Sequence, residues 1–144
     1  MKLRLDDDKM SDGFFEDTRI LGIACTLKNY QFCWHIDQLL QIGFQTSADL
    51  QIPMEKNKRS YSFTVYEYIH QLTQKEHFLY SNKHEGEFLL PELQHLDYIW
   101  LIRDPQHDDA EFSRLQQRLK EIPGVQLVTE VSHDKIKSKD NLQR

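Results

Sequence analysis

The chain has 144 residues, of which 39% are hydrophobic and 28% charged, so it can fold around one core and is too apolar for intrinsic disorder. Its 18 Lys and Arg against 23 Asp and Glu give a net charge of −5, which argues against non-specific attraction to nucleic-acid phosphates. Cys25 and Cys33 are too few for a disulfide framework and indicate buried thiols in a reducing compartment. Without a signal-like N-terminus or a long apolar run, we expect a cytoplasmic protein that does not span a membrane.

The first part of the chain alternates between strand and helix signals. Residues 1–17 contain an acidic cluster and predict a short strand or a loosely held arm. Residues 19–27 place apolar side chains at every second position, which predicts a strand covered on both faces. Residues 28–43 change to apolar spacings of three and four, which predict an amphipathic helix with Gly43 as its C-terminal cap. A short extended piece then follows and stops at Pro53.

The remaining elements follow from alternation, from a hairpin, from one unbroken apolar run at residues 98–102 and from helical spacing. Further strands are predicted at residues 59–70, 77–82, 98–102 and 125–131. The clearest helix has Asp108 as its N-cap with Glu111 three residues on, which is a capping-box spacing, and it ends at Pro123 and Gly124. Residues 132–144 are predicted to be a polar tail that frays.

This order of elements predicts a single α+β domain over residues 1–144. It favours a two-layer sandwich in which a mostly antiparallel or mixed sheet of five to six strands carries two main helices on one face. The helices would lie beside each other, as in split βαβ arrangements. The opposite sheet face, with Tyr66 and Tyr68, would then meet a protein partner or stay partly wet. A homodimer through that face is the simplest such arrangement.

No motif indicates a metal, a nucleotide or a covalent intermediate. The seven histidines are scattered and form neither HxH nor HExxH: His35, His70, His77, His84, His95, His107 and His133. A GxSxG elbow and a glycine-rich phosphate loop are also missing from the sequence. We therefore expect no metal site and no cofactor.

A cluster of acidic residues precedes the strand at residues 98–102. Its members are Glu85, Glu87, Glu92 and Asp97, with His84 and His95 nearby. Two such groups could perform acid–base chemistry if their environments separated their pKa values. However, Pro91 lacks a backbone donor and interrupts strand pairing, so Glu92 and Asp97 can accept hydrogen bonds from unpaired backbone N–H groups. The pattern favours this structural role over catalysis.

Tyrosines interleaved with cations offer an alternative, because aromatic side chains on an open sheet face can stack nucleic-acid bases. The candidates are Tyr61, Tyr66, Tyr68 and Tyr80, with Lys56, Lys58, Arg59 and Lys83. Tyrosine is an ordinary strand residue and the net charge is negative, so nucleic-acid binding is disfavoured without being excluded.

The stretch LPELQHLDY, residues 90–98, resembles the motif after which the IPExxxVDY family of small Bacteroidetes proteins is named. Leu90 and Leu96 replace the motif's Ile and Val, and the remaining motif positions match as they stand. The likeness extends to residues 27–37, 81–86 and 137–142, so it covers nearly the whole chain.

The resemblance to this family implies no activity, cofactor or substrate for this chain. What the resemblance does imply is a set of residues to watch: Pro91, Glu92, Asp97 and Tyr98, then Asn82, Trp34 and His35. From the sequence we expect a cytoplasmic binding or interaction protein without catalytic activity. An RNA-associated accessory role is the alternative, and a carboxylate-dependent enzyme is the third.

Overall fold

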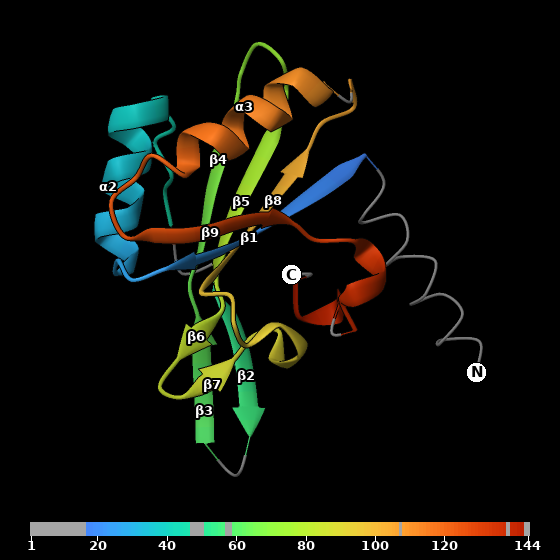
Figure 1. Ribbon diagram of the computed structural model, residues 1–144. Helices are drawn as coiled ribbons and strands as arrows, with labels where there is room; N and C mark the ends of the chain where they lie inside the picture. The colour runs from blue at the N-terminus through green and yellow to red at the C-terminus, as the bar shows by residue number, and fades with distance from the viewer. Residues whose placement is uncertain (1–16, 47–50, 57–58, 107, 138, 143–144) are drawn as a thin grey trace, which may run out of the picture.

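The computed structural model describes residues 17–46, 51–56, 59–106, 108–137 and 139–142. These ranges form a five-stranded antiparallel sheet, two α-helices, and two small two-stranded sheets (Figure 1). The predicted α+β class, with an antiparallel sheet and two main helices, is confirmed. Apart from Asp17, the arm predicted at residues 1–17 lies outside the described residues.

The main sheet contains two interlocked split βαβ units. Its strands are β4 (Val65–Ile69), β5 (Glu76–Ser81), β8 (Tyr98–Arg103), β1 (Thr18–Cys25) and β9 (Val125–Glu130), adjacent in that order. Every neighbouring pair is antiparallel, so β1 runs parallel to β5 with β8 between them, and β8 runs parallel to β9 with β1 between them. One helix lies in each connection, and β4 adds an edge strand.

Helices α2 (Asn29–Leu40) and α3 (Asp109–Leu119) bury their apolar sides against one face of the sheet. The start of α3 agrees with the prediction, because the Asp108 side chain accepts a hydrogen bond from the backbone N–H of Glu111 at 3.0 Å. The predicted end of α2 is wrong. The cap is Gln41, which adopts the left-handed region at φ 57° and donates its backbone N–H to the carbonyl of Asp37, so the helix ends before Gly43.

The strand predicted at residues 59–70 is divided. Its first half, β3 (Arg59–Phe63), pairs with β2 (Ile52–Lys56) in a separate ribbon, and its second half is β4 of the main sheet. The extended piece does not stop at Pro53, because Pro53 lies within β2 opposite Ser62. A two-stranded ribbon has a free edge on each strand, where the missing N–H of proline costs no pairing.

The sheet face opposite the helices is covered by the chain itself, so the expectation of an open face with Tyr66 and Tyr68 is wrong. The cover consists of β2 and β3, the segment around the 3-10 turn η2 (Pro91–Leu93), and the C-terminal segment that contains the 3-10 turns η3 (His133–Lys135) and η4 (Lys139–Leu142). The short ribbon of β6 (Lys83–His84) and β7 (Glu87–Phe88) lies beside β3. Figure 1 places both small ribbons at the opposite end of the molecule from α3. Tyr66 packs on the helix side instead, and Tyr68 lies against His77.

The C-terminal segment that was predicted to fray belongs to this cover in its described part. Ile136 and Leu142 are 2% and 0% exposed. The hydroxyl of Tyr80 donates to the carbonyl of Leu142 at 2.9 Å, and the Asn141 side chain donates to the carbonyl of Leu89. These isolated apolar residues give no periodic signal, so the polar composition of the segment concealed its buried positions.

Gly22 allows the cover to approach the sheet. A Cβ atom on Gly22 would lie 2.3 Å from Cδ1 of Leu96 and 3.0 Å from Cγ2 of Val131. Real Cβ atoms do not approach other atoms so closely, so any side chain here must displace the residues packed above it.

We expect Gly22→Ala to lower the free energy of unfolding by about 1–3 kcal/mol through overpacking, as measured by urea denaturation. Gly43→Ala is the matched control, because the nearest atom to its new Cβ, apart from its chain neighbours, is an Asp37 oxygen 4.0 Å away. Equal unfolding free energies for the two variants would contradict this account of the packing.

Candidate functional site

The motif segment is held by the side chain of Asn82, which is fully buried. Its amide nitrogen donates to the carbonyls of Leu93 at 3.0 Å and Leu96 at 2.9 Å, and its amide oxygen accepts the backbone N–H of Leu90 at 2.7 Å. The turn η2 is therefore tied to the residue after β5 by three hydrogen bonds of one side-chain amide. Asn82 is a structural clamp for the motif.

Asp97 occupies the point where β8 begins. Its Oδ2 accepts the backbone N–H of Cys25 at 2.8 Å, its Oδ1 lies 2.7 Å from Nζ of Lys83, and its own backbone N–H bonds to the carbonyl of Ile23. The carboxylate thus pairs with a backbone group of β1 just before the first residue of β8. This confirms the prediction that Asp97 accepts from unpaired backbone.

Glu92 bonds a different segment. Its Oε2 accepts the backbone N–H of Lys137 at 2.6 Å, and Pro91 before it opens the 3-10 turn in an exposed position. The prediction for Glu92 is confirmed as well. Because Glu92 and Asp97 bond to separate parts of the chain, this geometry gives no sign of a shared reacting centre.

Tyr98 fixes the turn that leads into α2. Its hydroxyl donates to the carbonyl of Leu27 at 2.7 Å and lies 3.0 Å from Oδ1 of Asn29, while its ring packs on Phe32 with centroids 4.6 Å apart. Burial raises the pKa of Tyr98 well above its usual value, so the hydroxyl stays protonated at neutral pH. It is a hydrogen-bond donor and an anchor for the start of the strand.

Trp34 and His35 lie on α2 and contact each other. Trp34 is 58% exposed and meets the ring of His35 edge to face at 5.0 Å. The structure therefore brings Asn82, Asp97 and Tyr98 to one end of the sheet and leaves this helical pair as a separate surface.

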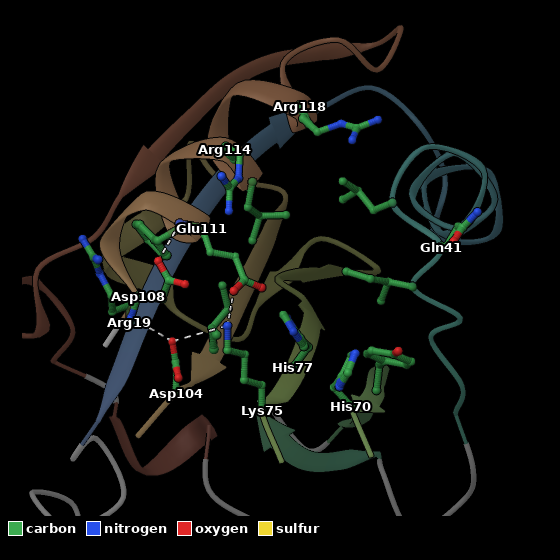
Figure 2. A pocket seen from close by; sticks show the side chains of 16 residues that line it. Arg19, Gln41, His70, Lys75, His77, Asp104, Asp108, Glu111, Arg114 and Arg118 are labelled. Atoms are coloured by element: carbon green, nitrogen blue, oxygen red, sulfur yellow. Dashed lines mark hydrogen bonds and ion pairs between the residues drawn. The ribbon is translucent and has the colours of Figure 1, made fainter. Parts of the chain in front are cut away.

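A cavity of about 420 Å³ lies elsewhere, between α3, the residues after α2, the β4–β5 hairpin and the end of β8 (Figure 2). Neither Glu92 nor Asp97 lines it. Its wall combines apolar residues of both helices with four cations and three acids, which are Arg19, Lys75, Arg114, Arg118, Asp104, Asp108 and Glu111.

Lys75 is a buried cation at the base of this cavity, with a side chain that is 8% exposed. Its Nζ forms an ion pair with Glu111 of α3 and lies 3.7 Å from Oδ2 of Asp104, as Figure 2 shows. Asp104 in turn accepts the backbone N–H groups of Gln106 and Asp108, which shapes the approach to α3. The network joins the hairpin, β8 and α3.

His77 is buried beside this network. Its Nδ1 accepts the indole N–H of Trp100 at 3.1 Å, so the neutral ring carries its proton on Nε2. Burial, reinforced by the positive charge of Lys75, lowers the pKa of His77 to about 4. The imidazole is therefore neutral at physiological pH.

Sequence reasoning missed this cavity as a site. Its polar residues come from four separate elements, and no spacing in the chain connects Lys75 with Glu111 or His77 with Trp100. One available signal was a lysine in the predicted turn, directly before the segment that becomes β5 (Glu76–Ser81). A lysine in such a position is either exposed or paired, and the sequence does not distinguish the two.

Metal and thiol chemistry find no support in the described ranges. No group of three or more His, Cys, Asp or Glu residues there is arranged to hold a metal ion. Burial raises the pKa of the Cys33 thiol to about 12 and also raises that of Cys25, so neither is a thiolate at neutral pH. None of the helices within these ranges is long and apolar enough to cross a membrane.

The tyrosines considered for base stacking do not form an open platform in the described part of the chain. Tyr80 is 1% exposed beneath the C-terminal segment, and Tyr66 is half-buried on the helix side. Tyr68 lines the cavity, and the side chain of Tyr61 lies outside what the structure describes. The geometry gives no support to single-strand stacking on this sheet.

We expect Asn82→Ala to lower the free energy of unfolding by about 3–5 kcal/mol, because two carbonyls and one N–H lose their partner inside the core. Chemical denaturation measures this loss. Gln94→Ala, at an exposed position of the same segment, is the control and should cost less than about 0.5 kcal/mol. A small effect at Asn82 would show that the clamp is dispensable.

The lowered pKa of His77 predicts an acid-sensitive fold. Below pH 6.5, the ordinary pKa of histidine, the ring is protonated in the unfolded chain, but in the folded protein it stays neutral until about pH 4. The free energy of unfolding therefore falls as the pH falls through this window. The contribution is at most about 3 kcal/mol. The groups around the ring are Lys75, His70, Asp104, Tyr68 and Trp100.

Unfolding free energies at about pH 7 and about pH 4.5 test this directly. His77→Gln retains a hydrogen-bond acceptor for Trp100 and should lose less stability than the wild type between the two pH values. His95→Gln, at an exposed position, should behave as the wild type does. An unchanged acid dependence in His77→Gln would contradict the prediction.

Comparison with known proteins does not assign a family. No protein-family model matches the chain, and no curated protein is similar to it in sequence. The resemblance of residues 90–98 to the IPExxxVDY motif therefore stays a prediction, and a function must be argued from the geometry described above.

Proposed function

We propose that this protein is a cytosolic interaction domain that binds a protein partner without catalysing a reaction. Its contact surface is the outward side of α2, centred on Tyr30 and Trp34. The observation that supports the proposal is the exposure of these two side chains, 69% for Tyr30 and 58% for Trp34.

The two aromatic residues form one surface feature. They are four residues apart on a 12-residue helix, so their side chains project from the same side of successive turns. Phe32 and Ile36 of the same helix are buried against the sheet, which leaves the aromatic pair on the side away from the core. Exposed tryptophan and tyrosine are the residues that most often dominate binding energy at protein interfaces.

The roles of the motif residues support binding over catalysis. Glu92 and Asp97 each accept a backbone N–H, and the hydroxyl of Tyr98 donates to a backbone carbonyl. Groups used in this way hold the chain in place. The motif then serves the proposed function indirectly, because Tyr98 fixes the turn from which α2 and its aromatic pair extend.

The cytosol is proposed as the compartment because both cysteines are free thiols. Cys25 is buried and Cys33 is half-buried, and neither has a disulfide partner. A reducing compartment preserves such thiols as small apolar side chains.

The test begins with a pull-down from native cytosol, performed with and without nuclease, using wild-type protein as bait. A protein retained in both conditions is purified, and its affinity for the variants is measured by calorimetry. Trp34→Ser should weaken binding by about 30-fold, as removal of an interface hot spot does. Tyr30→Ser should weaken it to a smaller extent.

Leu72→Ser is the matched control, because Leu72 is 91% exposed in the β4–β5 turn and lies outside α2. It should bind as the wild type does. Equal binding by Trp34→Ser and wild type would refute the proposed surface. Retention that nuclease abolishes would favour the RNA-associated alternative.

A further inference from the structure

The cavity between α3 and the sheet plays no part in the interaction surface on α2, and it has the features of a ligand site. Its volume of about 420 Å³ lies within the usual range for small-molecule pockets. Apolar side chains line one part of it, including Leu40, Ile42 and Leu115, and polar groups of the hairpin lie opposite. An apolar wall with a few polar groups is the ordinary composition of such pockets.

The ring of His77 supplies an unused hydrogen-bond donor here. His77 is 8% exposed and lines the cavity, and Figure 2 draws it between Lys75 and His70. Because Nδ1 is occupied by Trp100, the donor is Nε2–H, which has no hydrogen-bond partner in the part of the chain that the structure describes. No buried side-chain nitrogen or oxygen of the described residues lacks a partner, so this N–H is accessible, and it can donate to a ligand acceptor in the cavity that His77 lines.

Most of the cations around the cavity are already paired. Lys75 contacts Glu111 and Asp104, and Arg19 is bonded to Glu130 and Asp109. These groups shape the wall, but their charge is largely neutralised before any ligand arrives.

The two arginines of α3 differ from them. Arg114 has no ion pair or hydrogen bond within the described ranges, and Arg118 uses one NH₂ group to donate to the carbonyl of Leu39. In Figure 2, Arg118 points from α3 toward the end of α2, across the cavity mouth. Among the described residues neither guanidinium pairs with a carboxylate, so both can attract an anion to this opening.

We propose that the cavity binds a small organic carboxylate with an apolar body. The carboxylate is attracted by Arg114 and Arg118, the Nε2–H of His77 donates to an oxygen of the ligand, and the apolar body lies against Leu40, Ile42 and Leu115. This proposal does not depend on the partner surface of α2, so either can fail without the other.

The two tryptophans make the test specific, because the indole N–H of Trp100 bonds to His77, whereas Trp34 lies outside the cavity lining. In ¹⁵N-labelled protein titrated with sodium hexanoate or benzoate, the Trp100 indole signal should shift and saturate. The Trp34 indole signal should remain in place. The neutral analogues hexanamide and benzamide should bind at least about tenfold more weakly, because they lack the charge.

Three variants complete the design. Arg114→Gln should weaken hexanoate binding by about tenfold or more, since it removes an unpaired cation. Lys120→Gln, which removes one exposed charge from the end of the same helix, should leave binding unchanged. Ile42→Trp should abolish binding by filling the cavity from the loop after α2.

Several results would overturn the proposal. These are the absence of a saturable Trp100 shift with either carboxylate, binding that survives in Ile42→Trp, and equal losses in Arg114→Gln and Lys120→Gln. Inorganic phosphate provides a further arm. If phosphate binds as tightly as hexanoate, the site recognises anions in general and the organic carboxylate assignment is wrong.

Discussion

The side-chain amide of Asn82 is the constraint on which the second face of the sheet depends. Its hydrogen bonds to Leu90, Leu93 and Leu96 leave the motif segment one path across the strands, because any other path leaves buried polar groups unpaired. That path brings Leu96 onto the bare backbone of Gly22. The motif segment therefore has a structural role. Its polar groups form hydrogen bonds within the chain, and its aliphatic side chains pack in the core.

The acidic residues of the motif extend the same principle to the ends of elements. Pairing of β1 with β8 ends at Ile23 and Tyr98, and beyond it Asp97 supplies the acceptor that a longer strand would have provided to Cys25. Glu92 does the same for a backbone N–H of the C-terminal segment. A carboxylate accepts a hydrogen bond from a backbone N–H more strongly than a neutral carbonyl does. It therefore suits positions where one hydrogen bond takes the place of the pairing between two strands.

Local pattern was sufficient for most of the fold and for the role of the motif. Alternation located β1 and β9, an unbroken apolar run located β8, and the spacing of Asp108 and Glu111 located the start of α3. It failed where burial arises from distant contacts. Leu142 is buried because Tyr80 lies beneath it, and no periodicity in a polar tail reveals this. The cavity was missed for the same reason, since its polar groups meet only after the sheet has assembled.

The two faces of the sheet use their polar side chains differently, and Lys75 marks the difference. On the motif face, amide and carboxylate groups bond to backbone and leave aliphatic side chains in contact. On the helix face, a buried ammonium group requires carboxylates, and Asp104 and Glu111 provide them between the hairpin and α3. The cavity lies beside these polar side chains, and His77 lines it while its Nδ1 accepts the indole N–H of Trp100.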